Sequence, residues 1–241
     1  MPTYGGGMEI HMIKLQEKLD FLLDKYQVET KAVIKDLNTV TIDGKDISLL
    51  SHRYQRQFIE LKNIALGGTL VGISVMRVAR IIEKGEDLYK ALYRELDLCQ
   101  WILNDEIKQI TVMENGNVLN AIATTKSDIV CTIEVSATLK KGERPIEKHE
   151  IISERGIACD VVVDAQLKQD SIYVYGTENK KYTDVDFELY GLSIEEIAVV
   201  RSAFALAQKK NYDENIAADK QLNNLVQAAE KSAKNCERVV L

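Results

Sequence analysis

The chain has 241 residues, of which 46% are hydrophobic and 28% are charged. This is the composition of an ordinary globular protein with enough apolar residues for a substantial core. The formal net charge of −6 argues against binding to duplex nucleic acid, because neutralising phosphates requires a basic surface. No apolar run reaches the roughly 18 residues of a membrane-spanning helix, and the N-terminus lacks the apolar core of a signal peptide.

The cysteines and histidines predict neither a disulfide framework nor a metal centre. None of the four cysteines belongs to a CxxC pair: Cys99, Cys131, Cys159 and Cys236. The three histidines lie apart from them along the chain: His11, His52 and His149. We therefore expect buried free thiols in a reducing cytoplasm, and no zinc site.

The first hundred residues alternate between helical and extended patterns. Apolar residues at helical spacing predict an amphipathic helix over residues 8–27. The following stretch alternates around an Asp43-Gly44 turn signal, which predicts short strands up to Ser48. Helical spacing returns over residues 47–66 and stops at Gly67-Gly68. A β-branched run predicts a long strand over residues 69–82, and a second main helix is expected over residues 86–103.

The second half of the chain consists mainly of short strand patterns separated by turn signals. The clearest, "CTIEVSATL" (131–139), places apolar and polar residues on opposite faces, as in a half-buried antiparallel strand. Ser193 and Glu196 form a capping box that predicts a helix from residue 193. A last helix and a short strand, "ERVVL", are expected to follow.

These patterns predict an α+β fold with a large, mostly antiparallel (mixed) sheet and helices packed on one face. Residues 1–46 are expected to form an N-terminal helix with short strands, and residues 47–241 the main α+β domain. The chain contains neither GxGxxG nor GxxxxGK[ST], so the common nucleotide-binding loops are missing.

Three stretches carry a family resemblance: "RYQRQFIELKNIALGGTLVGISVMRV", "YRELDLCQWIL" and "LVQAAEKSAKNCERVVL". In this order, from about residue 50 onward, the chain resembles the C-terminal domain of the glucose-fructose oxidoreductase / inositol dehydrogenase family of NAD(P)-dependent sugar dehydrogenases. The resemblance implies a dehydrogenase C-terminal-domain-like fold. It also implies that the open sheet face serves in contacts between subunits.

The sequence departs from the family's catalytic pattern at several points. Family members open with a Rossmann domain and a catalytic Glu-Lys-Pro segment, whereas Glu17-Lys18 is not followed by proline. The family's acid/base Asp and His positions fall here on Lys90 and Arg94. Arginine is a poor base because it stays charged near neutral pH, and lysine is one only when burial lowers its pKa.

Two hypotheses follow from the resemblance. In the first, the chain has no catalytic residues and binds no cofactor alone, and it acts as a homodimeric or larger scaffold or as a sugar-like small-molecule binding module. In the second, it is the substrate-binding half of an oxidoreductase whose NAD(P) is held by a separate Rossmann subunit. A substrate carboxylate or phosphate would then be recognised by four residues: Arg94, Lys90, Arg80 and Tyr93. The competing interpretation is that Lys90 and Arg94 form a solvated helix face.

Two other charged stretches have competing interpretations. "HEIISERGIACD" (149–160) either binds a polar ligand or shows the alternating exposure of an antiparallel strand. Asp184, Asp186 and Glu188 either hold a divalent cation or form the polar face of a sheet.

Overall fold

The computed structural model describes residues 5–160, 171–174, 180–183, 188–189, 191–209 and 212–241. The chain divides into two compact units, one of residues 1–55 with 185–220 and one of residues 56–184 with 221–241. This division differs from the predicted one at residue 46, because a segment from the C-terminal half belongs to the first unit.

The first unit is built from helices on a small antiparallel sheet. Helix α1 (Gly5–Lys25) precedes three hairpin-connected strands: β1 (Ala32–Asp36), β2 (Thr39–Ile42) and β3 (Lys45–Ser48). The predicted Asp43-Gly44 turn joins β2 to β3, with positive φ at both residues, as a tight hairpin requires. Leu15 and Leu19 of α1 pack with Val40 of β2 and with Val200 of α4 (Ile194–Lys209) in one apolar core.

The helix predicted over residues 47–66 is shorter than expected. Ile47 pairs with Val40 in the small sheet, a short 3-10 helix η1 covers Ser51–Tyr54, and α2 covers only Arg56–Leu66. Gln55 between them has extended backbone angles, so the helical hydrogen bonds cannot run through. The apolar spacing of residues 47–50 reflects the core of the first unit and not a helix face.

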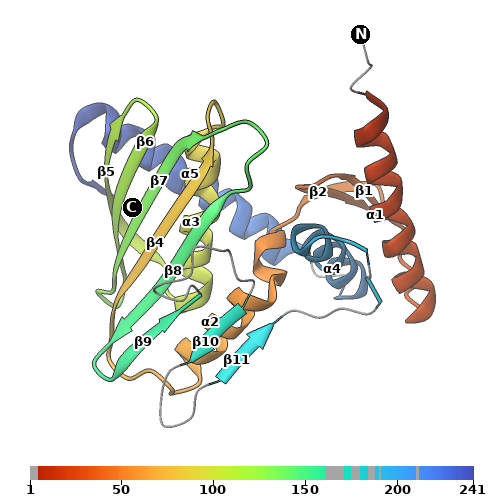
Figure 1. Cartoon of the computed structure of the whole chain (residues 1–241), viewed down its shortest axis with the longest axis horizontal. Helices are drawn as coiled ribbons and strands as arrows, with labels where there is room; N and C mark the ends of the chain where they lie inside the picture. The colour runs from red at the N-terminus through yellow and green to blue at the C-terminus, as the bar shows by residue number, and fades with distance from the viewer. Residues whose placement is uncertain (1–4, 161–170, 175–179, 184–187, 190, 210–211) are drawn as a thin grey trace. The chain divides into compact units, whose positions relative to one another are not determined.

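The second unit contains a mixed sheet of nine strands among the described residues (Figure 1). In spatial order its strands are β11 (Lys180–Thr183), β10 (Ser171–Val174), β9 (Gly156–Cys159), β8 (Ile146–Ser153), β4 (Ile73–Glu83), β7 (Val130–Leu139), β6 (Val118–Thr125), β5 (Ile107–Asn115) and β12 (Val239–Val240). The pairing of β4 with β7 is parallel, and the other described pairings are antiparallel. The predicted α+β class and mixed sheet are therefore confirmed.

One face of this sheet is covered by α2, by α3 (Leu88–Leu103) and by the C-terminal part of α5 (Asp213–Asn235). Alternate residues of each central strand enter this buried face, for example Met76 and Val78 of β4 and Ile133 and Val135 of β7. Residues of the opposite register, such as Arg77 and Glu134, point to the open face. The sheet thus has one buried face and one solvent-exposed face, as expected for a half-buried sheet.

Helix α3 begins and ends at well-defined caps. The Asp87 carboxylate accepts hydrogen bonds from the backbone N–H groups of Tyr89 (2.8 Å) and Lys90 (3.3 Å), which satisfies donors that have no partner inside the helix. Asn104 ends the helix in the left-handed conformation. The buried face of α3 includes an apolar stripe of four residues: Leu92, Leu96, Cys99 and Leu103.

Candidate functional site

Six ionisable side chains meet under the covered face of the second unit. We call them the ion-pair cluster: Arg80, Arg94, Glu95, Glu147, His149 and Asp160. Strands β4 and β8 place Arg80 opposite Glu147 in register and His149 two residues further along the same face. Helix α3, which covers this face, contributes Arg94 and Glu95. Asp160 follows directly after β9.

Two arginines and two glutamates of this cluster form a closed ring of alternating charge. The Nη1 atom of Arg94 contacts Glu95 Oε1 and lies 3.1 Å from Glu147 Oε2. The Nη1 atom of Arg80 contacts the same Glu147 oxygen and lies 3.6 Å from the same Glu95 oxygen. Each carboxylate oxygen in this Arg–Glu ring is therefore shared by two cations, which compensates the cost of burying the charges.

His149 extends the ring to a third carboxylate. Its Nδ1 lies 2.6 Å from Asp160 Oδ2 and its Nε2 lies 2.9 Å from Glu95 Oε2. A neutral imidazole has only one N–H, so two carboxylate acceptors on opposite ring nitrogens favour the imidazolium form. Asp160 also accepts the backbone N–H of His149 at 2.7 Å through its other oxygen, which fixes the carboxylate against the ring.

The first turn of α2 completes the surroundings of the cluster. The Gln57 side-chain amide donates to Glu147 Oε1 at 3.1 Å. The Phe58 ring stands edge-on to His149, with ring centroids 4.7 Å apart. The same ring lies 5.1 Å below the Arg94 guanidinium carbon, which adds a cation–π contact. Phe58 therefore contacts two cations of the cluster and separates them from the neighbouring apolar core.

Burial opposes the charges of Glu95, His149 and Arg94, and the neighbouring charges outweigh it for these three groups. For Glu95, the cost of burial is outweighed by Arg94, His149 and Arg80, which lower its pKa from 4.5 to about 2. For His149, burial is outweighed by Asp160 and Glu95, which raise its pKa from 6.5 to about 10. The carboxylates of Glu147 and Glu95 likewise raise the pKa of Arg94 against the effect of burial. At neutral pH Glu95 is therefore an anion, and Arg94 and His149 are cations.

The four predicted site residues do not lie together. Arg94 and Arg80 meet in the Arg–Glu ring, each with about 15% of its side chain exposed. Lys90 is exposed on the first turn of α3, where its backbone is part of the Asp87 cap, and Tyr93 is half-buried beside Arg94 in sequence. The interpretation of Arg94 as a solvated helix residue is wrong, because two carboxylates hold its guanidinium against the sheet.

Sequence reasoning missed the carboxylates that complete the cluster. Glu95 lies inside the apolar stripe of α3, next to Leu92 and Leu96, and this position was itself a signal of burial. In "HEIISERGIACD" the two ends, His149 and Asp160, are buried and bonded to each other. The middle of that stretch is the exposed turn between β8 and β9. The interpretation as alternating exposure therefore describes its middle, whereas its two ends are a pair of polar groups in contact.

The predicted carboxylate row falls mostly on undescribed residues. Asp184 and Asp186 lie outside the described residues, and Glu188 bonds to Lys25 and Tyr26 of the first unit. Within the described ranges, no group of three His, Cys, Asp or Glu side chains is arranged to hold a metal ion. In the same part of the chain, no helix is long and apolar enough to cross a membrane.

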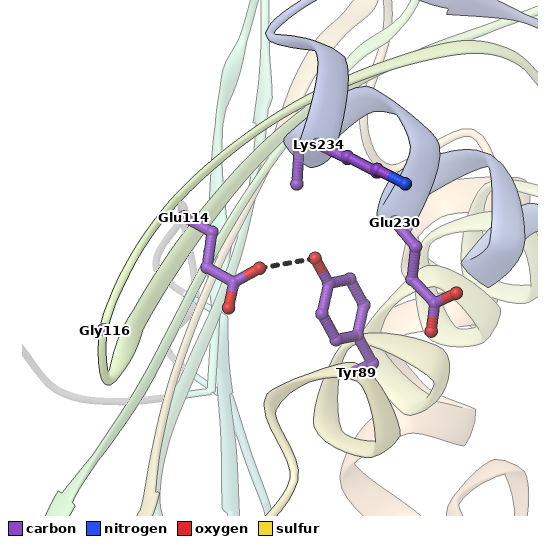
Figure 2. A pocket seen from close by; sticks show the side chains of 6 residues that line it. Tyr89, Glu114, Gly116, Glu230 and Lys234 are labelled. Atoms are coloured by element: carbon purple, nitrogen blue, oxygen red, sulfur yellow. Dashed lines mark hydrogen bonds between the residues drawn. The ribbon is translucent and has the colours of Figure 1, made fainter.

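A separate pocket of about 420 Å³ lies at the N-terminal end of α3 (Figure 2). It is formed by the first turn of α3, the β5–β6 hairpin and the last turns of α5, with Tyr89, Glu114, Glu230 and Lys234 as its polar lining. The Tyr89 hydroxyl donates to Glu114 at 2.6 Å. Burial and the neighbouring carboxylates of Glu114 and Glu230 raise the pKa of Tyr89, so the phenol stays protonated. The charged groups around the pocket are exposed to solvent.

Three of the four cysteines are buried, as predicted, and Cys236 is exposed. The neighbouring thiol of Cys131 on β7, together with burial, raises the pKa of Cys99 on α3 well above its ordinary value. A thiol that is buried and protonated reacts slowly with electrophiles and oxidants. These thiols therefore serve as core side chains.

The fold is similar to that of part of several solved oxidoreductases. An oxidoreductase from Agrobacterium radiobacter, solved with NAD+, L-tartaric acid and magnesium, superposes with a TM-score of 0.65 at 16% identity, over 80% of this chain and 64% of the other. The scyllo-inositol dehydrogenase of Lactobacillus casei, solved with NAD(H) and scyllo-inositol, gives 0.57 at 12% identity, over 79% and 63%. An oxidoreductase domain protein from Kribbella flavida gives 0.63 at 11% identity, over 79% and 64%.

These comparisons confirm the predicted resemblance to the inositol dehydrogenase class at the level of the fold. The chain spans a little under two thirds of the length of these proteins, which agrees with a C-terminal domain without the Rossmann part. No protein-family model matches the sequence. A search of curated proteins also gives no match.

Proposed function

We propose that this chain is a non-catalytic relative of the sugar dehydrogenase C-terminal domain, which assembles into homo-oligomers and holds a small sugar-like molecule. The observation that carries the proposal is the state of Arg94. It stands where the family resemblance places the acid/base histidine, and its guanidinium is engaged by Glu95 and Glu147. A permanently charged group held by two carboxylates cannot accept a proton from a substrate hydroxyl.

The rest of the cluster supports the same proposal. His149 lies in the same cluster, but both of its ring nitrogens are directed at carboxylates. An imidazolium with a pKa near 10 is a weak acid and has no free lone pair to act as a base. A histidine and carboxylates, the residue types that serve in proton transfer, are therefore present in the cluster. Because they are bonded to one another, their arrangement favours a structural role. The buried free thiols favour a cytoplasmic location.

The open face of the large sheet supports homo-oligomer formation. Large apolar side chains are exposed on or beside it: Met113, Val118, Ile122, Ile146 and Ile157. The same face carries cations at Arg77 and Lys148 and an anion at Glu134. A two-fold interface brings a patch against its own copy, and a patch that carries both signs of charge beside apolar residues can pair with itself without placing like charges together.

The catalytic half of the proposal is tested by an activity assay on the full chain. The protein is incubated with NAD+ or NADP+ and a panel of polyols, including myo-inositol, and reduced nicotinamide is followed by absorbance. An intact inositol dehydrogenase serves as the positive control. We expect no turnover above the rate without protein. Polyol-dependent reduction that is lost in Arg94→Gln would refute the proposal.

The assembly half is tested with a matched pair of variants. Ile122 on the open sheet face is 49% exposed, and Ile216 on α5 is 47% exposed. Size-exclusion chromatography with light scattering should show a dimer or larger for the parent chain. Ile122→Glu should shift the population to monomer, whereas Ile216→Glu should not. A parent chain that is monomeric at about 100 μM, well above a micromolar Kd, would contradict oligomerisation.

The coverage of the solved neighbours favours one alternative function. These two proteins were solved with NAD, and the match leaves about a third of their length unmatched. The alternative is therefore the substrate-binding half of an oxidoreductase, with NAD(P) bound by a separate Rossmann subunit. A neighbouring gene for an isolated Rossmann domain, and polyol oxidation only on mixing the two purified proteins, would support it over the scaffold.

A further inference from the structure

The pocket at the N-terminal end of α3 is lined by charged groups of both signs (Figure 2). Its volume of about 420 Å³ lies within the range of small-molecule sites, which is roughly 300–1,000 Å³. Glu114 and Glu230 contribute carboxylates, Lys234 contributes an ammonium group, and the phenol of Tyr89 is neutral. Two carboxylates and one ammonium group leave one negative charge in excess. None of these residues belongs to the ion-pair cluster.

The charged side chains that line the pocket form no ion pairs within the described part of the chain. Glu230 and Lys234 lie four residues apart on α5, a spacing at which Glu and Lys side chains commonly pair. Arg56 and Glu60 on α2 do pair at this spacing, at 2.6 Å. Among the described residues, no ion pair within 4.0 Å engages Glu114, Glu230 or Lys234. The head groups of all three therefore remain available to a ligand.

The Glu114 carboxylate is held at one oxygen and can accept at the other. The Tyr89 hydroxyl donates to Oε2 of Glu114 at 2.6 Å, and no described residue donates to Oε1. Gly116, at the tip of the β5–β6 hairpin, leaves this side of the pocket open, because a Cβ atom there would meet no atom within 4 Å. The pocket therefore offers two carboxylates and one ammonium group around a space that a ligand can enter from solvent.

We propose that this pocket binds a free basic amino acid, which carries two ammonium groups and one carboxylate near neutral pH. The ligand carboxylate lies against Lys234, and its ammonium groups lie against Glu114 and Glu230. Its one positive charge in excess compensates the excess negative charge of the lining. A diamine would instead place an ammonium group beside Lys234, and a dicarboxylate would place carboxylates beside the two glutamates, so each would bring like charges together. This inference goes beyond the proposed function and does not depend on it.

The exposure of the pocket sets the affinity that we expect. All three charged lining residues are exposed to solvent, and a single ion pair between exposed groups changes an affinity only about two- to fivefold. A ligand that makes three such contacts should therefore bind with a Kd on the order of 1 mM. Loss of one charged group from the ligand should weaken binding by the factor for a single ion pair.

The test is an NMR titration of the isotope-labelled full chain with three probes that differ in one group. L-lysine carries both ammonium groups and the carboxylate, L-norleucine lacks the side-chain ammonium group, and cadaverine lacks the carboxylate. Sodium chloride at equal ionic strength controls for unspecific screening. We expect L-lysine to shift the backbone amide signals of Gly116, Ala233 and Lys234 saturably. Norleucine and cadaverine should bind about two- to fivefold more weakly.

Substitutions on α5 match each group of the ligand to its partner. Lys234→Met removes the ammonium group, so it should weaken L-lysine binding about two- to fivefold while cadaverine binds as before or more tightly. Glu230→Gln should weaken the binding of both ligands, because both carry ammonium groups. Lys231→Met is the matched control, since Lys231 is exposed on the same helix and does not line the pocket. It should bind L-lysine like the parent, and circular dichroism verifies that each variant is folded.

Three outcomes would overturn the inference. They are no saturable shifts with L-lysine up to about 20 mM, well above a millimolar Kd; norleucine or cadaverine binding as tight as L-lysine binding; and L-lysine binding that is unchanged in Lys234→Met. Each of them would leave the proposed function standing, because that function is tested by dehydrogenase activity and by oligomeric state. Dehydrogenase activity would in turn remove the proposed function without affecting the amino-acid site.

Discussion

The positive charge on His149 stabilises the folded chain, and this stabilisation is lost as the pH becomes alkaline. The imidazole is buried between Glu95 and Asp160, and its pKa is raised from 6.5 to about 10. A group whose pKa is higher in the folded state stabilises the fold fully below its unfolded pKa, and this contribution is lost as the pH rises through the folded pKa. The window of loss for His149 therefore runs from about pH 6.5 to about pH 10.

The size of the effect follows from the two pKa values. One pH unit of difference corresponds to 1.36 kcal/mol, so the imidazolium contributes on the order of 4–5 kcal/mol at pH 6. Because Asp160 and Glu95 are 3% and 0% exposed, little screening by solvent reduces this value. Within the window, the free energy of unfolding should fall by up to about 1.4 kcal/mol for each pH unit.

Other groups titrate in the same range, so the measurement compares the parent with His149→Gln. Urea denaturation is followed by fluorescence of Trp101, the single tryptophan, which lies on α3. The difference in unfolding free energy between the two proteins should be largest near pH 6 and should shrink by several kcal/mol towards pH 10. A difference that stays constant over this range would mean that His149 is neutral in the folded protein, and would refute the reasoning.

Three further substitutions test single contacts, each by urea denaturation at pH 7. Glu95→Gln should cost roughly 3–5 kcal/mol, because it leaves buried cations without a shared anion; a cost below about 1 kcal/mol would show that the cluster is hydrated. Asp87→Ala should cost about 1 kcal/mol by removing the cap of α3, and Glu86→Ala, one residue earlier and without a cap bond, should cost nothing measurable. Ser232→Ala should cost about 1–3 kcal/mol, because the buried hydroxyl accepts the backbone N–H of Val112 at 2.9 Å; equal stability would mean that water replaces the hydroxyl.

Much of the fold could be predicted because its signals are local. The alternation of residues 131–139, the Asp43-Gly44 turn and the Ser193–Glu196 capping box each became the expected structure, and the hydrogen bonds of that box are present. The error at residues 47–50 arose because a buried strand end and a buried helix turn both place apolar residues close together. Which strands lie side by side, including the parallel β4–β7 pair, depends on contacts that no local pattern specifies.

The candidate site was predicted only in part, for a related reason. Arg94 and Arg80 were found through their positions in a resemblance and through their chemistry. Their partners Glu95 and Glu147 lie one residue and 53 residues from Arg94 in the chain. The pairing of Glu147 with Arg80 is set by the register of β8 against β4. The sequence contained one indication of a buried ion pair, namely a charged residue, Glu95, inside the apolar stripe of α3.

We propose that this chain keeps the frame of a dehydrogenase domain without its chemistry. Calorimetric titration of the full chain with NAD+, NADH, NADP+ and NADPH tests it most directly, because hydride transfer requires the dinucleotide. We expect no binding heat up to about 1 mM dinucleotide, the weak end of the usual affinity range. Saturable binding with a Kd in the micromolar range or below would contradict it.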